Sequence, residues 1–257
     1  MMQPTHCGDG WSVHVGDSLR ILTEWEGPAF AGVVTDPPYS SGGQTRADRT
    51  MRTRTKYLNS DSPNQHTLED FDGDNRDQRS WLVWMSIWLD AARRVTEPGG
   101  SLLMFCDWRQ LPTATDAVQA GGWVWRGIIP WNKTEEARPQ KGRFRAQCEY
   151  VVWATHGPHV PYADDAPCLP GWFTCIAPRD RIHVTEKPVA VEAELCRVVR
   201  PDGLICDPFL GSGAHGEGAI TAGRQFVGFE RMPTIADLAA RRLAEAALQQ
   251  PLFGGRS

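Results

Sequence analysis

Near the C-terminal end of the chain, a short apolar run leads through an acid and a glycine-rich turn into a segment typical of a helix. The run is residues 204–206 and the acid is Asp207. The turn carries three glycines with the spacing G-x-G-x-x-G: Gly211, Gly213 and Gly216. A second apolar run, residues 225–229, follows and ends in Glu230. A strand, a helix and a second strand in this order predict two parallel strands of one sheet.

The rest of the chain alternates between strand and helix patterns in the same way. Strands are predicted at residues 11–15, 32–35, 101–106, 123–131, 148–154, 203–206 and 225–229. Helices are predicted at residues 18–25, 81–95, 111–120, 189–199, 214–222 and 235–248. Three tryptophans at helical spacing, Trp81, Trp84 and Trp88, predict a helix face packed in the core. The alternation indicates an α/β fold, a Rossmann-like doubly wound and mostly parallel sheet with helices on both faces.

A second informative feature is the tetrapeptide Asp36-Pro37-Pro38-Tyr39, which directly follows the apolar run 32–35. Two successive prolines remove two backbone donors and fix two φ angles, so the strand must end there. The Asp36 carboxylate and the Pro37 carbonyl can accept the two N–H bonds of an exocyclic amine, and Tyr39 can stack on the ring that bears it. The four residues are candidate catalytic residues, although such dipeptides also mark ordinary turns.

The glycine turn by itself leaves the class of cofactor open. Its spacing fits a dinucleotide, whose pyrophosphate would lie at the helix N-terminus. Asp207 argues against this, because a carboxylate repels a pyrophosphate and attracts the sulfonium and ammonium groups of S-adenosylmethionine. Glu230 is placed to hold ribose hydroxyls. With Asp17 and Asp36, these acids lie at predicted strand ends, where ligands bind in open α/β sheets.

Five segments resemble, in their order, the β group of the amino-methyltransferases that modify adenine or cytosine in DNA. The segments are Gly16-Asp17-Ser18-Leu19 with Leu22; residues 36–39; Trp131-Asn132-Lys133 with Arg143-Phe144 and residues 149–153; residues 183–188; and residues 207–213. The resemblance covers nearly the whole chain. It departs from the family at Ala214 and His215, where two threonines are usual, at Val184, where proline is usual, and near Ile235, where tyrosine is common.

The resemblance implies transfer of a methyl group from S-adenosylmethionine to the exocyclic amine of a base flipped out of DNA. Residues 36–39 would form the catalytic motif. The implied cofactor-binding residues are Asp17, Thr185, Lys187, Asp207, Pro208, Phe209, Gly211, Gly213 and Glu230. An aspartate at the head of the tetrapeptide is more typical of adenine than of cytosine, so adenine is expected and cytosine is the alternative. Less favoured alternatives are a dinucleotide-dependent oxidoreductase, which leaves Asp36 and Asp207 unexplained, and a DNA-binding protein without catalysis.

Two basic segments are candidates for contact with the phosphates of double-stranded DNA. The first follows the tetrapeptide and contains Arg46, Arg49, Arg52, Arg54 and Lys56. The second contains Lys141, Arg143 and Arg145. Charge runs are most often solvated loops. The first, however, begins where the phosphate backbone around a flipped base has to pass.

The domain organisation follows from these segments. Residues 1–154 and 183–248 are predicted to form a single catalytic domain, and residues 40–78 a basic loop that faces DNA. Residues 155–182, dense in Pro, Gly and Asp, lie where the family has its target-recognition region, so they are predicted to be a small recognition segment. Residues 249–257 are expected to be a flexible tail.

Composition excludes several other classes. No stretch of about 18 uncharged apolar residues suggests a membrane span, and the N-terminal residues do not resemble a secretion signal. The seven cysteines form no C-x-x-C pair and the seven histidines no H-x3-H cluster, so no metal site is expected. Reduced cysteines favour a cytoplasmic enzyme, bacterial or phage-encoded by the resemblance. The sequence leaves open whether the protein is a homodimer.

Overall fold

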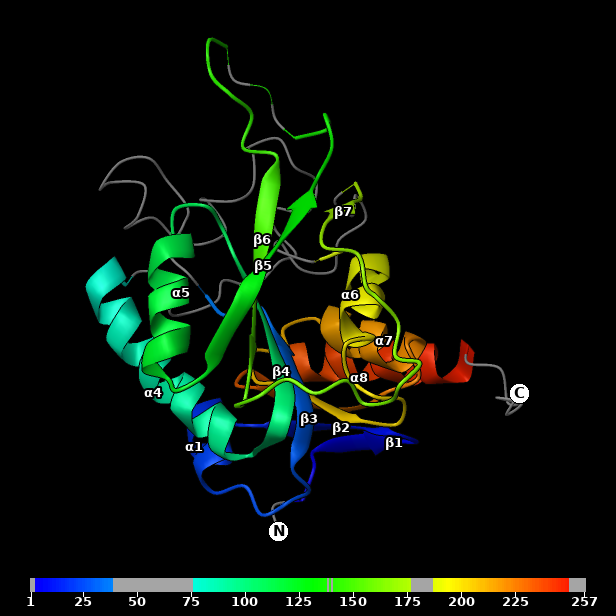
Figure 1. The fold of residues 1–257 in the computed structure, drawn as a ribbon. Coiled ribbons are helices and arrows are strands. Elements are labelled where there is room, and N and C mark those ends of the chain that lie inside the picture. The colour runs from blue at the N-terminus through cyan, green and yellow to red at the C-terminus, as the bar shows by residue number, and fades with distance from the viewer. Residues whose placement is uncertain (1–2, 39–75, 138, 140, 177–186, 250–257) are drawn as a thin grey trace.

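One sheet organises the protein, and its strands occur in the order β1-β2-β9-β8-β3-β4-β6-β5-β7 (Figure 1). The computed structural model describes residues 3–38, 76–137, 139, 141–176 and 187–249. The strands are β1 (His6–Gly8), β2 (Trp11–Val15), β3 (Phe30–Thr35), β4 (Thr96–Cys106), β5 (Val124–Asn132), β6 (Cys148–Thr155), β7 (Phe173–Thr174), β8 (Leu204–Asp207) and β9 (Gln225–Glu230). The helices are α1 (Ser18–Thr23), α4 (Gln78–Arg94), α5 (Leu111–Ala120), α6 (Val189–Cys196), α7 (Ala214–Thr221) and α8 (Pro233–Gln249).

The centre of the sheet is parallel and its margins are mixed. Strands β2, β9, β8, β3 and β4 pair in parallel, so their carboxyl ends meet at one edge. Strands β1, β6 and β5 pair antiparallel with their neighbours, and the short β7 pairs in parallel with β5. The predicted doubly wound α/β fold is confirmed. Because β6 runs against β4, its first residues lie at the same edge as the carboxyl ends of the parallel strands.

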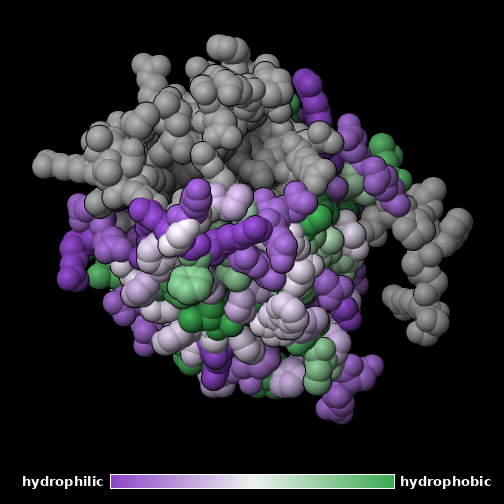
Figure 2. Space-filling model, turned by 90° about the horizontal axis from the view of Figure 1, so that it is seen from above, coloured by the Kyte–Doolittle hydropathy of each residue, from purple (hydrophilic) through white to green (hydrophobic). Residues whose placement is uncertain are grey.

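Helices cover both faces of the sheet (Figure 1). Residues of α1, α4 and α5 form one core with one face, and residues of α6, α7 and α8 form a second core with the other. The interpretation of the tryptophan stripe as core is confirmed, since Trp81 and Trp88 are each 1% exposed and Trp84 is partly buried against the same core. Seen from above, the described surface mixes hydrophilic residues with small separate hydrophobic patches (Figure 2).

Three strands differ most from the prediction: β1, β4 and the two-residue β7, which lies in segment 155–182, where no strand was predicted. β1 has only three residues and was not predicted, because its one partner along the margin of the sheet, β2, cannot be read from a local pattern. β4 begins at Thr96 rather than at Ser101, because Thr96 pairs with Phe30 before a register shift restores pairing at Gly32. Neighbouring Gly99, with a φ of 82°, takes the left-handed conformation that glycine allows.

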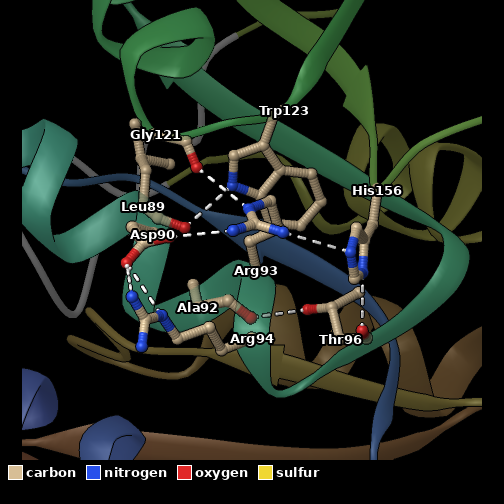
Figure 3. A network of polar contacts seen from close by, with 9 residues as sticks. All are labelled: Leu89, Asp90, Ala92, Arg93, Arg94, Thr96, Gly121, Trp123 and His156. Atoms are coloured by element: carbon tan, nitrogen blue, oxygen red, sulfur yellow. Dashed lines mark hydrogen bonds and ion pairs between the residues drawn. The ribbon is translucent and has the colours of Figure 1, made fainter.

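The C-terminal end of α4 is fixed to the sheet by a polar network (Figure 3). Arg93 donates to Asp90 at 2.9 Å and to the carbonyl of Gly121 at 3.2 Å, and lies 3.3 Å from a ring nitrogen of His156. The other ring nitrogen of His156 lies 2.8 Å from the Thr96 carbonyl. The network joins α4, the end of α5 and strands β4 and β6, so it fixes the helix that supports the site described next.

Candidate active site

Four acidic residues line up along the carboxyl edge of the parallel strands. Asp17 follows β2, Glu230 ends β9, Asp207 ends β8 and Asp36 follows β3, in the order in which these strands neighbour one another. The expectation that these acids lie at strand ends is confirmed. Asp17 also caps α1, because its carboxylate accepts the backbone N–H of Arg20 at 3.1 Å.

The turn after β3 is held by a tryptophan of α4. The indole N–H of Trp81 donates to the carbonyl of Pro38 at 2.7 Å. At the last residue of β3, the Thr35 hydroxyl donates to Asp207 at 2.8 Å and thereby joins the ends of β3 and β8. Sequence analysis placed Trp81 in the core but gave no sign of this hydrogen bond. Tyr39, the last residue of the tetrapeptide, lies outside the described residues.

The two carboxylate oxygens of Asp36 have different surroundings. Oδ2 forms an ion pair with the ammonium group of Lys187, whereas Oδ1 is buried and accepts no hydrogen bond within the described part of the chain. Burial raises the pKa of the Asp36 carboxyl, Lys187 opposes the rise, and the nearby Glu149 adds to it. A buried acceptor without a partner costs free energy until a donor arrives, and an exocyclic amine is such a donor.

Lys187 lies between two carboxylates. Besides the pair with Asp36, its Nζ is 3.4 Å from Oε2 of Glu149, whose Oε1 accepts a hydrogen bond from Lys133 at 3.1 Å. Burial alone would lower the pKa of Lys187, but the charges of Asp36 and Glu149 outweigh burial and raise that pKa. Burial alone would raise the pKa of Glu149, but Lys187 and Lys133 outweigh it and lower that pKa. Lys187 and Glu149 are therefore both charged near neutral pH.

The glycine turn after β8 has the backbone conformation that its glycines allow. Gly211 and Gly213 have φ angles of 51° and 85°, in the left-handed region, and a Cβ on Gly213 would meet the Cβ of Ala239 at 3.2 Å. One carboxylate oxygen of Glu230 accepts the Gly211 N–H at 3.0 Å. The ring centroids of Phe209 and Trp88 are 4.9 Å apart, so α4 packs against this turn as well as against the turn after β3.

Asp207 is engaged within the protein. Its carboxylate is fully buried and accepts from the Thr35 hydroxyl and from the Phe209 N–H, at 2.8 and 3.0 Å. Nδ1 of His215 lies 2.8 Å from its second oxygen. The sequence predicted that Asp207 faces a cationic cofactor. In the structure, the Asp207 carboxylate makes hydrogen bonds within the protein that hold the glycine turn. Pro208, next to it, is buried.

His215 sits between two buried acids. Its Nε2 is 3.5 Å from Glu192, whose carboxylate accepts no hydrogen bond among the described residues. Burial raises the pKa of Glu192 to about 7. Burial alone would lower the pKa of His215, but Glu192 and Asp207 outweigh it and raise that pKa to about 9. The only sign of this cluster in the sequence was His215 itself, where the resembled family has threonine.

Of the other residues that the sequence predicted for the site, the structure describes only some. Thr185, Arg46, Arg49, Arg52, Arg54 and Lys56 lie outside the described residues. Lys141, Arg143 and Arg145 are exposed on the connection between β5 and β6, which extends away from the body of the molecule at the carboxyl edge (Figure 1). Arg145 donates to the Glu135 carbonyl. Of segment 155–182, the two residues of β7 join the margin of the sheet. Among the described residues, no helix has the length and apolarity needed to cross a membrane.

The sequence matches one known family and a curated relative over most of its length. The profile of a family described as "DNA methylase" matches residues 30–241. The chain is 26% identical over 238 residues to the Escherichia coli (strain K12) protein named "Putative methylase YubD", covering 91% of this chain and 92% of that protein.

Two solved structures share the fold. The M1.HpyAVI–SAM complex has a TM-score of 0.65 at 18% identity and covers 91% of this chain and 98% of its own. The cytosine-N4-specific PvuII DNA methyltransferase has a TM-score of 0.68 at 17% identity and covers 99% of this chain and 91% of its own. At these identities the likeness concerns the fold.

Proposed function

Because the chain belongs to the family of DNA methylases that modify the amines of adenine N6 or cytosine N4, we propose that it methylates the N6 amine of an adenine flipped out of double-stranded DNA. The observation that carries the proposal is the placement of Asp36 beside the glycine turn at the carboxyl edge of the sheet, with one oxygen that accepts no hydrogen bond from the described residues. The aspartate at the head of the tetrapeptide favours adenine.

Cytosine N4 is the second candidate, because the cytosine-N4-specific PvuII enzyme has the same fold. The test is to incubate the protein with S-adenosylmethionine and mixed-sequence DNA, digest the DNA to nucleosides and separate them by mass spectrometry. N6-methyladenine as the product supports the proposal. N4-methylcytosine alone would replace it by the second candidate, and no methylated nucleoside would overturn both.

The proposed mechanism depends on positioning. The exocyclic amine is a weak nucleophile, because its lone pair is delocalised into the ring. If Oδ1 of Asp36 and the Pro37 carbonyl accept its two N–H bonds, the lone pair becomes localised and is aimed at the methyl group. Tyr39 would stack on the flipped base, and base–aromatic stacking of about 1–3 kcal/mol offsets part of the cost of unstacking.

The residues around the glycine turn suit S-adenosylmethionine, the cofactor of the family, which supplies a methyl group activated by a sulfonium centre. Each Glu230 oxygen accepts a backbone N–H, from Gly211 and from Met232. Carboxylate oxygens have further lone pairs, so Glu230 can also accept from ribose hydroxyls. Asp207 would act through the conformation of the turn, and Asp17, Phe209 and Gly213 lie along the same edge.

Replacing Glu230 by glutamine is expected to weaken S-adenosylmethionine binding about 10- to 100-fold, because hydrogen bonds to a charged group contribute about 1.5–3 kcal/mol. Isothermal titration calorimetry measures this, with Glu194→Gln on the outer part of α6 as the matched control. Unchanged affinity in the Glu230 variant, or tight binding of NAD by the wild type, would contradict the assignment of the glycine turn.

The basic connection between β5 and β6 is proposed to bind DNA phosphates. Replacing Lys141 and Arg143 together by alanine is expected to lower the slope of log affinity against log salt by about 0.9 for each phosphate interaction removed. The loss of affinity should be equal on target and scrambled duplexes, because interactions with phosphates carry no sequence information. Arg200→Ala, at the opposite edge of the sheet, is the control. A change in site preference without a change in slope would assign base recognition to this segment.

A further inference from the structure

A row of alternating charges leads inward from the β5–β6 margin to Asp36. The order is Lys133, Glu149, Lys187 and Asp36, and each neighbouring pair lies within ion-pair distance. Lys133 directly follows β5 and Glu149 lies at the start of the adjacent β6. Lys187 precedes Pro188, the N-cap of α6, and Asp36 follows β3. Four separate segments thus contribute to a row that ends at Oδ2 of Asp36, which Lys187 contacts directly.

Burial along this row is deepest at Lys187, the third member. The side chains of Lys133 and Glu149 are 23% and 18% exposed, that of Asp36 is 13% exposed, and that of Lys187 only 3%. An ammonium group this deeply buried is stable only if opposite charges face it. Two carboxylates do so here, and the Phe105 ring lies 5.3 Å from Nζ. Because Nζ of Lys187 is bound by Asp36 and Glu149, the structure favours a role at Asp36 over the cofactor-binding role that the resemblance implies for Lys187.

We propose that Lys187 is a positioning residue for methyl transfer: it holds Oδ2 of Asp36, so that Oδ1 is presented to the substrate amine, and Glu149 offsets its charge. The inference rests on the proposed function and deepens it. A carboxylate bound at one oxygen no longer rotates freely about its Cβ–Cγ bond, which fixes the direction in which the other oxygen accepts. Misplacement of such a group by about 1 Å can cost about 100-fold in rate.

Glu149 is needed because an ammonium group alone would make Asp36 a poorer acceptor. Lys187 draws electron density from the carboxylate and would also repel the positive charge that develops on the amine as its nitrogen is methylated. A second carboxylate on the far side of Lys187 reduces both effects. Among the described residues, the charged or titratable groups that face Asp36 from the packed elements are Lys187, Glu149 of β6, Glu192 of α6, His215 of α7 and Cys106 of β4.

Two substitutions separate this role from cofactor binding. Lys187→Met is expected to lower kcat about 10- to 100-fold and to leave the Kd for S-adenosylmethionine within about threefold. Its pH profile should shift to higher pH, because Lys187 lowers the pKa of Asp36. Glu149→Gln should shift the profile to lower pH, because Glu149 raises that pKa. Opposite shifts from two neighbouring residues are not expected from a loss of packing.

The experiment uses the full chain, with kcat and KM for DNA measured from pH 5 to 9, cofactor Kd by calorimetry and folding by thermal melting. Arg200→Met, which removes a cation from an exposed ion pair, is the control. If Lys187→Met does not fold, Glu149→Gln and the double variant decide by their pH profiles. A weakened cofactor Kd with unchanged kcat, or profiles that do not move, would overturn the inference while wild-type methylation still supports the proposed function. Absence of wild-type methylation would instead overturn the function.

Discussion

Asp36→Ala is expected to lower the rate of methyl transfer by a factor of about 10²–10³, because removing one hydrogen-bonding group from the reacting amine costs about 2.7–4 kcal/mol of transition-state stabilisation. S-adenosylmethionine binding should stay within a few fold, since Asp36 is proposed to bind the amine and not the cofactor. Single-turnover transfer of a labelled methyl group to DNA measures the first quantity, and calorimetric titration measures the second.

Two variants make this result specific to the carboxylate. Asp116→Ala removes an exposed aspartate from α5 and should keep full activity. Asp36→Asn keeps the size of the side chain and a hydrogen-bond acceptor but removes the charge, so its rate should fall between those of wild type and the alanine variant. If Asp36→Ala retains more than about a tenth of the wild-type rate while folded, the proposed role of this residue is wrong.

His215→Ala is expected to lower the free energy of unfolding at pH 7 by about 3–5 kcal/mol, since it removes one partner of a buried charged group. Asp207 would lose its partner at 2.8 Å and Glu192 its partner at 3.5 Å, and solvent cannot readily replace them because both carboxylates are fully buried. Urea denaturation followed by circular dichroism measures the change. His159→Ala, an exposed histidine, should change stability little, and an equal loss in both variants would contradict the expectation.

The same cluster makes stability depend on pH. The folded-state pKa of Glu192 is about 7 and that of His215 about 9, both above their ordinary values of 4.5 and 6.5. Each group therefore contributes stability that is present below its unfolded pKa and is lost as pH rises through its folded pKa. The unfolding free energy of the wild type should fall between pH 5 and 9, and that of His215→Thr/Glu192→Gln should fall less. A steeper fall in the double variant would refute this assignment.

Much of the fold and part of the site follow from local sequence. Helix α5 was predicted at its observed bounds, because apolar spacing and the following glycines act within a few residues. The end of β3 was fixed by Pro37 and Pro38, which cannot continue a ladder. Acids after the ends of parallel strands must share one edge, so the convergence of Asp36, Asp207 and Glu230 was also predictable.

The partners of these residues were decided by the tertiary structure. Lys187 lies 151 positions from Asp36 in sequence, and Thr35 lies 172 positions from Asp207. Such pairs depend on which strands neighbour one another and on which helix covers each turn, as with Trp81 and Pro38. Strand ends and turns are set by the restrictions that adjacent residues impose on the backbone, so the sequence alone determined where the acids and glycines lie. Which oxygen of Asp36 lacks a partner among the described residues depends on burial and on distant charges, and so does the raised pKa of His215; these exist only once the chain has folded.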